Sequence, residues 1–232
     1  QRMNLQEIKE GTTTLISKNY DNGQRLTGMS FNNGTAATCT YNANNSIASI
    51  LHKRVSPLTT IAQFNYTSDN ETNILTAQKA HRPSNSERYV YNSNQQLVNY
   101  KEGTLSGGNI AAPVTQSQFN LDGVQNRTSV VKDGVTTNYT SNIVNQYTTI
   151  NSGSTISPTY DLNGNTLTDG TQNYAYGDND QLLTVNGGAI ATYQYDALGR
   201  RTKKMAGPTT VFYYYDGNNV IEERNASNSV QA

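Results

Sequence analysis

The sequence is poor in the residues on which most catalytic and metal sites depend. It contains one cysteine, Cys39, two histidines, His52 and His81, and no tryptophan. A single cysteine excludes a disulfide within the chain, and one thiol with two imidazoles cannot form a dedicated zinc site without carboxylates. Neither histidine lies in a recognisable catalytic motif. We therefore expect no catalytic residue, no metal and no cofactor in this chain.

Long apolar runs and an excess of charge of one sign are also missing. No segment approaches the roughly 20 apolar residues of a membrane-spanning helix. Seventeen basic residues balance seventeen acidic ones, which argues against nucleic acid as a partner. The one basic cluster, Arg200-Arg201-Thr202-Lys203-Lys204, is expected to be a solvated strand face or a guard against pairing at a sheet edge.

The sequence does contain a repeated unit, in which an aromatic residue is followed by Asp or Asn and then by a turn. The clearest copy is Tyr193-Gln194-Tyr195-Asp196-Ala197-Leu198-Gly199-Arg200-Arg201. Spacings between units run from 16 residues (Tyr160 to Tyr176) to 28 residues (Tyr91 to Phe119). The aromatic residues that we take as structural anchors are Tyr20, Tyr41, Tyr66, Tyr91, Phe119, Tyr139, Tyr160, Tyr176, Tyr195 and Tyr215.

Each unit has the composition of a β-hairpin. Aromatic and β-branched residues favour strands, and an Asp or Asn side chain can hydrogen-bond its own backbone to begin a turn. A glycine in the turn supplies positive φ without strain, and we assign this role to Gly23, Gly123, Gly164, Gly199 and Gly217. An aliphatic residue often follows six places after the anchor and should return on the same face as the aromatic ring, as in Leu26, Ile47, Leu97, Leu182 and Ile221.

The units together predict an all-β array of about ten hairpins that form one long, strongly curled antiparallel sheet. Ten hairpins give about twenty strands, and open sheets rarely exceed about ten strands without curling. We expect a single array over residues 1–232, with degenerate repeats in 1–118 and well-matched repeats in 119–232. Only 34% of the residues are hydrophobic, so we expect thin packing by tyrosine rings whose hydroxyls stay in water.

These units resemble the YD repeats of the bacterial Rhs family, which includes rearrangement-hotspot and tripartite-toxin proteins. The family pattern is close to Tyr-x-Tyr-Asp-x-x-Gly-Arg-Leu, and residues 193–201 match it except at the last position. Residues 121–128, 144–148 and 213–223 resemble the segment that commonly precedes the family's core. The resemblance covers nearly the whole chain and is stronger from Phe119 onward.

The resemblance implies a structural role. In the family, the repeats form a sheet that spirals into a hollow shell around a toxic C-terminal domain. The family's core carries a self-cleavage site that ends in an Asp-Pro-x-Gly type motif, but this chain has no Asp-Pro pair, so neither cleavage nor toxicity is carried over. We expect a shell module, secreted or on the bacterial cell surface. Its partners would be the rest of its own longer chain, namely the Rhs core and the toxin cargo.

Two other functions remain open at this point. A row of tyrosine rings and Asn amides could bind surface glycans, as in an adhesin, although the same rings could simply pack between hairpins. Open sheet edges could also join copies of the chain, as in a dimer or a fibre subunit. The Asp and Asn clusters 161–165 and 178–180 have oxygen ligands at loop spacing, but they do not satisfy the EF-hand pattern and are better explained as turns.

Overall fold

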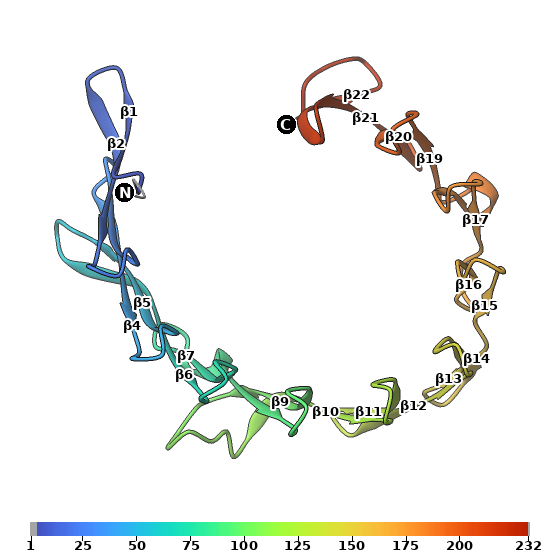
Figure 1. Ribbon diagram of the computed structural model, residues 1–232, viewed down its shortest axis with the longest axis horizontal. Helices are drawn as coiled ribbons and strands as arrows, with labels where there is room; N and C mark the ends of the chain where they lie inside the picture. The colour runs from blue at the N-terminus through green and yellow to red at the C-terminus, as the bar shows by residue number, and fades with distance from the viewer. Residues whose placement is uncertain (1–3, 232) are drawn as a thin grey trace. The chain divides into compact units, whose positions relative to one another are not determined.

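The structure, a computed structural model, describes residues 4–231 and is built almost entirely from β-strands (Figure 1). Its other regular segments are two short 3-10 turns, η1 (Pro83–Asn85) and η2 (Asn186–Gly188). The strands are β1 (Glu7–Glu10), β2 (Thr13–Tyr20), β3 (Leu26–Phe31), β4 (Thr35–Tyr41), β5 (Ile47–Arg54), β6 (Thr59–Ser68), β7 (Ile74–Lys79), β8 (Ser86–Tyr91), β9 (Leu97–Gly103), β10 (Pro113–Leu121), β11 (Arg127–Lys132), β12 (Val135–Ser141), β13 (Tyr147–Asn151), β14 (Thr155–Ile156), β15 (Thr159–Tyr160), β16 (Thr166–Thr168), β17 (Tyr174–Tyr176), β18 (Leu182–Val185), β19 (Ala191–Tyr195), β20 (Arg201–Ala206), β21 (Thr209–Asp216) and β22 (Asn219–Asn225).

The predicted all-β, antiparallel architecture is confirmed. The strands form three sheets, and within each sheet the strand order follows the sequence: β1 to β14, β15 with β16, and β17 to β22. The expectation of one continuous sheet is therefore wrong. Contacts within the chain divide it into two compact units. The first runs up to Asn120 and includes Val130–Thr136. The second contains Leu121–Ser129 and the residues from Thr137 onward.

Both interruptions of the sheet lie in the second unit, beside the hairpin of β15 and β16. Pro158 separates β14 from β15, and proline has no N–H group with which to continue a ladder of hydrogen bonds. After β16, Gly170 has a φ of +87° and lies against Ile156, where a Cβ atom would come within 2.2 Å of Ile156 Cγ2. Only glycine fits this approach.

The sheets are single layers with very little buried core. The apolar residues that are buried within residues 4–231 are Ala36, Ala37, Ala77, Ile110, Val185 and Ala191. The accessible surface is 15022 Å², whereas a compact monomer of this mass would expose about 10,300 Å². Cohesion must therefore come from contacts along the sheet rather than from a core between layers.

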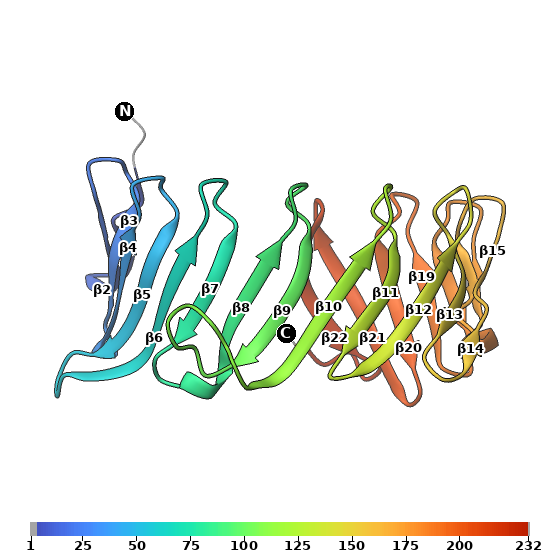
Figure 2. The same ribbon diagram turned by 90° about the horizontal axis from the view of Figure 1, so that it is seen from below.

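Register within the hairpins agrees with the spacing rule from the sequence. Tyr20 pairs with Leu26, and the same six-residue offset joins Tyr41 to Ile47, Tyr91 to Leu97 and Tyr176 to Leu182. In each of these hairpins a β-bulge separates this pair from the next pair away from the turn. The last hairpin is the exception, because its shorter turn pairs Tyr215 with Val220 instead of Ile221. In the first unit, the turns after β4, β6 and β8 lie along one edge of the sheet (Figure 2).

Each of these turns begins with an Asp or Asn, or with Gly177 in one case. The residue with left-handed backbone conformation comes three places after this first turn residue. The ten residues at this position have φ between 57° and 91°, and they are Gln24, Asn45, Thr72, Gln95, Gln125, Asn145, Gly164, Asp180, Gly199 and Asn228. Gly164 and Gly199 thus occupy it as expected. Gly23 and Gly123 do not, because Gln24 and Gln125 adopt the left-handed conformation in their turns. Gly217 has a φ of 56° but belongs to the shorter turn closed by Asp216 and Asn219.

This geometry predicts opposite effects for two glycine substitutions. Gly199→Val places a β-branched residue at a φ of +79° with its Cβ 3.2 Å from Gln181 Nε2, and should destabilise the fold by at least about 1–2 kcal/mol. Gly123→Ala is the control, because its φ is not left-handed and its Cβ would contact nothing; it should be neutral or stabilising by up to about 1 kcal/mol. Thermal or urea unfolding of both variants measures this, and equal unfolding midpoints would contradict the assignment.

Candidate functional site

The most regular chemistry in the chain is at the turns, where an Asp or Asn side chain organises the backbone. In the turn after Tyr195, Oδ1 of Asp196 accepts hydrogen bonds from the N–H groups of Leu198 (2.9 Å) and Arg200 (3.0 Å). The backbone of Asp196 closes the same turn through Gly199 N and Arg200 O. Side-chain oxygens accept the same two backbone bonds at Asn92, Asp122, Asn142, Asp161 and Asn225.

The residue four places after the Asp or Asn folds back onto the same side chain. Arg200 contacts Asp196 Oδ2 through Nε (2.8 Å) and through its terminal nitrogen (2.7 Å). Arg25 does the same to Asp21 Oδ2, at 2.7 Å for both nitrogens. Asparagine takes this place in other turns, for example where Asn165 Nδ2 donates to Asp161 Oδ2 at 3.0 Å.

These hydrogen bonds lower the pKa of the turn carboxyls. The side chain and then the backbone N–H of Arg200 hold the pKa of Asp196 below its usual value. At Asp21 the backbone N–H of Arg25 is the largest cause and its side chain the next. Asn165 lowers the pKa of Asp161 in the same way, mainly through its side chain. The turn carboxylates are therefore stabilised in the ionised form.

The residue that folds back also reaches the next hairpin. Arg25 places its guanidinium 4.7 Å from the centre of the Tyr41 ring and donates to Asn45 Oδ1 at 2.7 Å. Arg200 lies 4.9 Å from the centre of the Tyr215 ring and donates to the backbone oxygen of Gly217. Each arginine therefore joins its own carboxylate to the aromatic anchor and the left-handed residue of the following turn.

Asparagine makes the same connection without charge. Asn126 Nδ2 donates to Asn145 Oδ1 at 2.9 Å, and Asn165 Nδ2 donates to Asp180 Oδ1 at 2.7 Å. Asn163 adds a second bond to the same oxygen of Asp180 at 2.9 Å. The side chains of Asp161, Asn163, Asn165 and Asp180 are thus joined by hydrogen bonds, and Asp161 also binds its own backbone, which supports the interpretation of these clusters as turns.

The anchor tyrosines form a second set of links between hairpins. The hydroxyl of Tyr195 donates to the backbone oxygen of Leu182 at 3.0 Å, and that of Tyr41 donates to Leu26 O at 2.8 Å. In both cases the acceptor lies six places after the preceding anchor. The same rule holds for Tyr215 with Arg201 O (2.8 Å). Tyr160 donates to Tyr147 O (3.2 Å), which lies six places after Ser141, the residue that enters the preceding turn. The expectation that the hydroxyls stay in water did not include these bonds to the backbone of another hairpin. We call the tyrosine bonds, the Asp/Asn side-chain bonds and the links of the fourth residue the turn network.

Three of the anchors taken from the sequence do not lie directly before the turn, where the other anchors lie. Tyr66, Phe119 and Tyr139 each lie two places before the residue that enters the turn, which is Ser68, Leu121 or Ser141. At Ser141 the ring comes from the opposite strand, because Tyr147 packs on Tyr139 at 5.1 Å and its hydroxyl accepts the N–H of Arg127 at 3.0 Å. An alignment on the Asp or Asn instead of the aromatic residue would have found this register.

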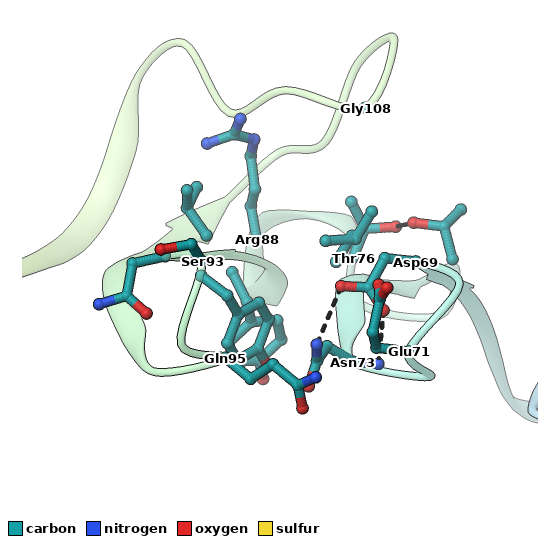
Figure 3. Close-up of a pocket in the computed structure, with 14 residues that line it drawn as sticks. Asp69, Glu71, Asn73, Thr76, Arg88, Ser93, Gln95 and Gly108 are labelled. Carbon is teal, nitrogen blue, oxygen red and sulfur yellow. Dashed lines mark hydrogen bonds between the residues drawn. The ribbon is translucent and has the colours of Figure 1, made fainter.

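An open cleft of about 550 Å³ lies in the first unit, between the turns that follow β6 and β8 (Figure 3). It is lined by polar residues of both turns, including Asp69, Asn73 and Gln95, and by Arg88, which extends toward the loop that carries Gly108. Within the described chain, the lining of this cleft includes no histidine or cysteine.

His81 and the basic cluster have structural contacts. The Nδ1 atom of His81 lies 3.1 Å from the backbone nitrogen of Gln63, and its ring packs edge-on against Phe64 at 4.9 Å. Except for Arg200, which is in the preceding turn, the basic cluster is on β20, which lies between β19 and β21, so it does not guard a sheet edge. Its cations lie over aromatic rings instead, Arg201 at 4.8 Å from Tyr193 and Lys203 at 5.3 Å from Phe212.

Neither a metal centre nor a transmembrane helix is found in the part of the chain that the structure describes. Over residues 4–231, no group of three or more His, Cys, Asp or Glu side chains could hold a metal ion. In the same range, no helix has the length and apolarity required to cross a bilayer.

Comparison with curated proteins finds relatives for half of the chain. It is 38% identical over 126 residues to the tRNA3(Ser)-specific nuclease WapA of Bacillus spizizenii, and 37% identical over 126 residues to the tRNA nuclease WapA of Bacillus subtilis strain 168. Each match covers 50% of this chain and only 5% of the relative, so the chain spans about one twentieth of the curated proteins that it matches. No protein-family model matches the chain.

Comparison with solved structures covers nearly the whole chain. The Tc holotoxin pore of Photorhabdus luminescens matches with a TM-score of 0.67 and 18% identity, over 94% of this chain and 12% of that chain. A TcdB2–TccC3 crystal structure (the TEV form) matches with a TM-score of 0.64 and 18% identity, over 92% of this chain and 13% of that chain. At this identity the likeness establishes the fold.

The turn network predicts that the anchor hydroxyls contribute to stability. Tyr195→Phe keeps the ring but removes the bond to Leu182 O, and should cost about 0.5–1.5 kcal/mol of unfolding free energy. Tyr193→Phe, on the same strand, is the control, since the structure gives the Tyr193 hydroxyl no hydrogen bond within residues 4–231. Chemical denaturation of the two variants gives the difference. Equal losses would show that the hydroxyl bond contributes nothing.

The turn carboxylates predict a loss of stability in acid. Because the folded state lowers their pKa below the reference value of 3.8, they stabilise the fold above about pH 4, and this contribution is lost as pH falls through the lower folded pKa values. Asp196→Asn keeps the Oδ1 acceptor but loses the ion pair with Arg200. The variant should melt at lower temperature than the parent at neutral pH and approach it at about pH 2–3. Parallel melting curves across this range would contradict the prediction.

Proposed function

We propose that this chain, a YD-repeat array of the Rhs family, is a segment of the wall of a hollow protein shell. The observation that carries the proposal is the turn network. The hairpin of β19 and β20 shows the pattern in full: Tyr195 donates its hydroxyl to the hairpin before it, and Arg200 binds the hairpin after it. Several other hairpins make one or both of these links. Hairpins joined in this way can be added without limit, as a wall requires.

The thin construction of the sheet supports the same function. A single layer leaves both faces accessible and buries few apolar residues, so it can divide one compartment from another without forming a core of its own. A sheet of 14 strands also exceeds the roughly ten strands beyond which open twisted sheets curl or split. We infer that the array curls into part of a closed wall when the rest of the polypeptide is present.

The enclosed partner, in this proposal, is another region of the same longer polypeptide. The curated relatives are named as tRNA nucleases, and this chain corresponds to 5% of their length. We assign the chain no catalytic role, and we propose that it encloses the toxic region of a bacterial protein that is secreted or displayed at the cell surface. The hydroxyls that would be needed for an exposed tyrosine platform are in part bonded to backbone, which favours enclosure over sugar binding.

Limited proteolysis of the native polypeptide that carries this chain tests the proposal. Intact-mass measurement first establishes how much chain accompanies the array. If the array encloses a downstream region, mild protease should leave that region uncut, and the pair of changes Arg200→Gln and Tyr195→Phe should open the wall and expose it. Arg54→Gln is the control, since Arg54 makes no side-chain bond in the described structure.

The outcomes separate the two functions that were left open. A downstream region that is cut as fast in the parent protein as in the Arg200→Gln, Tyr195→Phe variant is not enclosed, and the shell function fails. A polypeptide with a mass close to the 25.4 kDa of this chain would have nothing to enclose. That result would instead point to an array that acts through its own edges or faces.

A further inference from the structure

The strands of neighbouring hairpins diverge as they approach the sheet edge at which the turns after the anchor residues lie. An aromatic ring fills the gap between them. Between the first two of these hairpins, β3 and β4 pair from Gly28–Thr38 to Ser30–Ala36 only. Tyr41 lies beyond the last pair, where its hydroxyl donates to Leu26 O. The bonds of Tyr160, Tyr195 and Tyr215 to the equivalent oxygens show the same arrangement. The gap is thus a recurring site for a phenol ring.

In one of these gaps a serine takes the place of the anchor tyrosine, and its partner on the returning strand, Ile74, supplies no ring. Between the hairpin of β4 and β5 and the hairpin of β6 and β7, Ser68 stands at the position of the anchor tyrosine. An open pocket of about 450 Å³ lies at this place, within the range of roughly 300–1,000 Å³ that is usual for ligand pockets. Its lining comes from both hairpins: Asn45, Ser46, Ile47, Ile50, Tyr66, Ser68, Thr72 and Ile74.

The walls of this pocket match the surroundings of a bound tyrosine. Ile47 is at the position of Leu26, whose backbone oxygen accepts the Tyr41 hydroxyl in the preceding gap. Ile47 is 41% exposed and so is Ile74, whereas Leu26 is half-buried. The difference follows from the missing ring. Ile50 and Tyr66 add further apolar surface, and the side chains of Asn45 and Thr72 place polar groups at the rim.

We propose that this pocket binds the phenol ring of a tyrosine side chain from a polypeptide segment that is not part of the described chain. The ring would take the place of the missing anchor, with its hydroxyl directed to the backbone oxygen of Ile47. The polar rim suits the peptide backbone on either side of such a tyrosine. The pocket is formed within the first unit alone, so this assignment does not depend on the wall being closed.

Titration of the chain with three small probes tests the proposal by nuclear magnetic resonance of labelled isoleucine methyl groups. The probes are p-cresol, toluene and N-acetyl-L-tyrosinamide. We expect p-cresol and the amide to cause saturable shifts at Ile47, Ile50 and Ile74, and none at Ile16 or Ile150, which are on other hairpins. Toluene lacks the hydroxyl and should bind about 2–10 times more weakly.

The Ser68→Tyr variant supplies the missing ring from the chain itself. It should raise the melting temperature and abolish the shifts caused by p-cresol. Thr67→Tyr is the matched control, because it places the same ring on the opposite face of the same strand, and it should leave binding intact. If Ser68→Tyr does not fold, Ile47→Asn replaces one exposed wall of the pocket and should weaken p-cresol binding by about tenfold.

Each remaining outcome overturns part or all of the assignment. No saturable shift at the three isoleucines, or unchanged shifts in Ser68→Tyr, means that the pocket is not a phenol site. Toluene binding as tightly as p-cresol removes the role of the hydroxyl and therefore the specificity for phenols. Binding of p-cresol without binding of N-acetyl-L-tyrosinamide means that the site admits free phenols only, and the polypeptide source fails.

Discussion

The hydrogen bonds that an Asp or Asn side-chain oxygen accepts at most of the turns are the interactions on which the rest of this structure depends. They fix five residues of backbone, and the fixed turn sets the register in which Tyr20 faces Leu26. In the turn that begins with Gly177, backbone bonds hold the same register, in which Tyr176 faces Leu182. That register brings the hydroxyls of Tyr41, Tyr195 and Tyr215 to a carbonyl of the preceding hairpin. A turn with one residue more or fewer would reverse the faces of the returning strand and break the links on both sides.

A single-layer sheet makes such links necessary. A globular domain is stabilised by apolar residues that pack between layers, but this chain buries few of them within the described residues. Its hairpins are instead joined by many weak contacts, such as the cation–π pairs of Arg25 with Tyr41 and Arg200 with Tyr215, each worth about 0.5–1 kcal/mol at an exposed site. Stability is then distributed along the array, as expected for a repeat protein.

The sequence predicts what depends on local chemistry. Strand alternation and the length of the turn are local, so the pairing of anchors with the residue six places on could be predicted, as in Tyr41 with Ile47. The left-handed position could not be found from glycine alone, since Gln24, Thr72 and Gln125 also occupy it. The tyrosine hydroxyls were expected in water because their acceptors belong to another hairpin. How closely two hairpins approach depends on the divergence of their strands, which no single repeat encodes.

Two of the three turns that lack an anchor ring, those at Ser68 and Ser141, show how the array responds to the missing ring. At Ser141, Tyr147 supplies a ring from the returning strand, and its hydroxyl accepts a backbone bond from Arg127, so the gap is filled from within. At Ser68 the corresponding residue of the returning strand is Ile74, which is too short to span the gap, and it remains 41% exposed together with Ile47. The same substitution at the anchor therefore has different consequences, and the residue six places later decides between a closed wall and an open pocket.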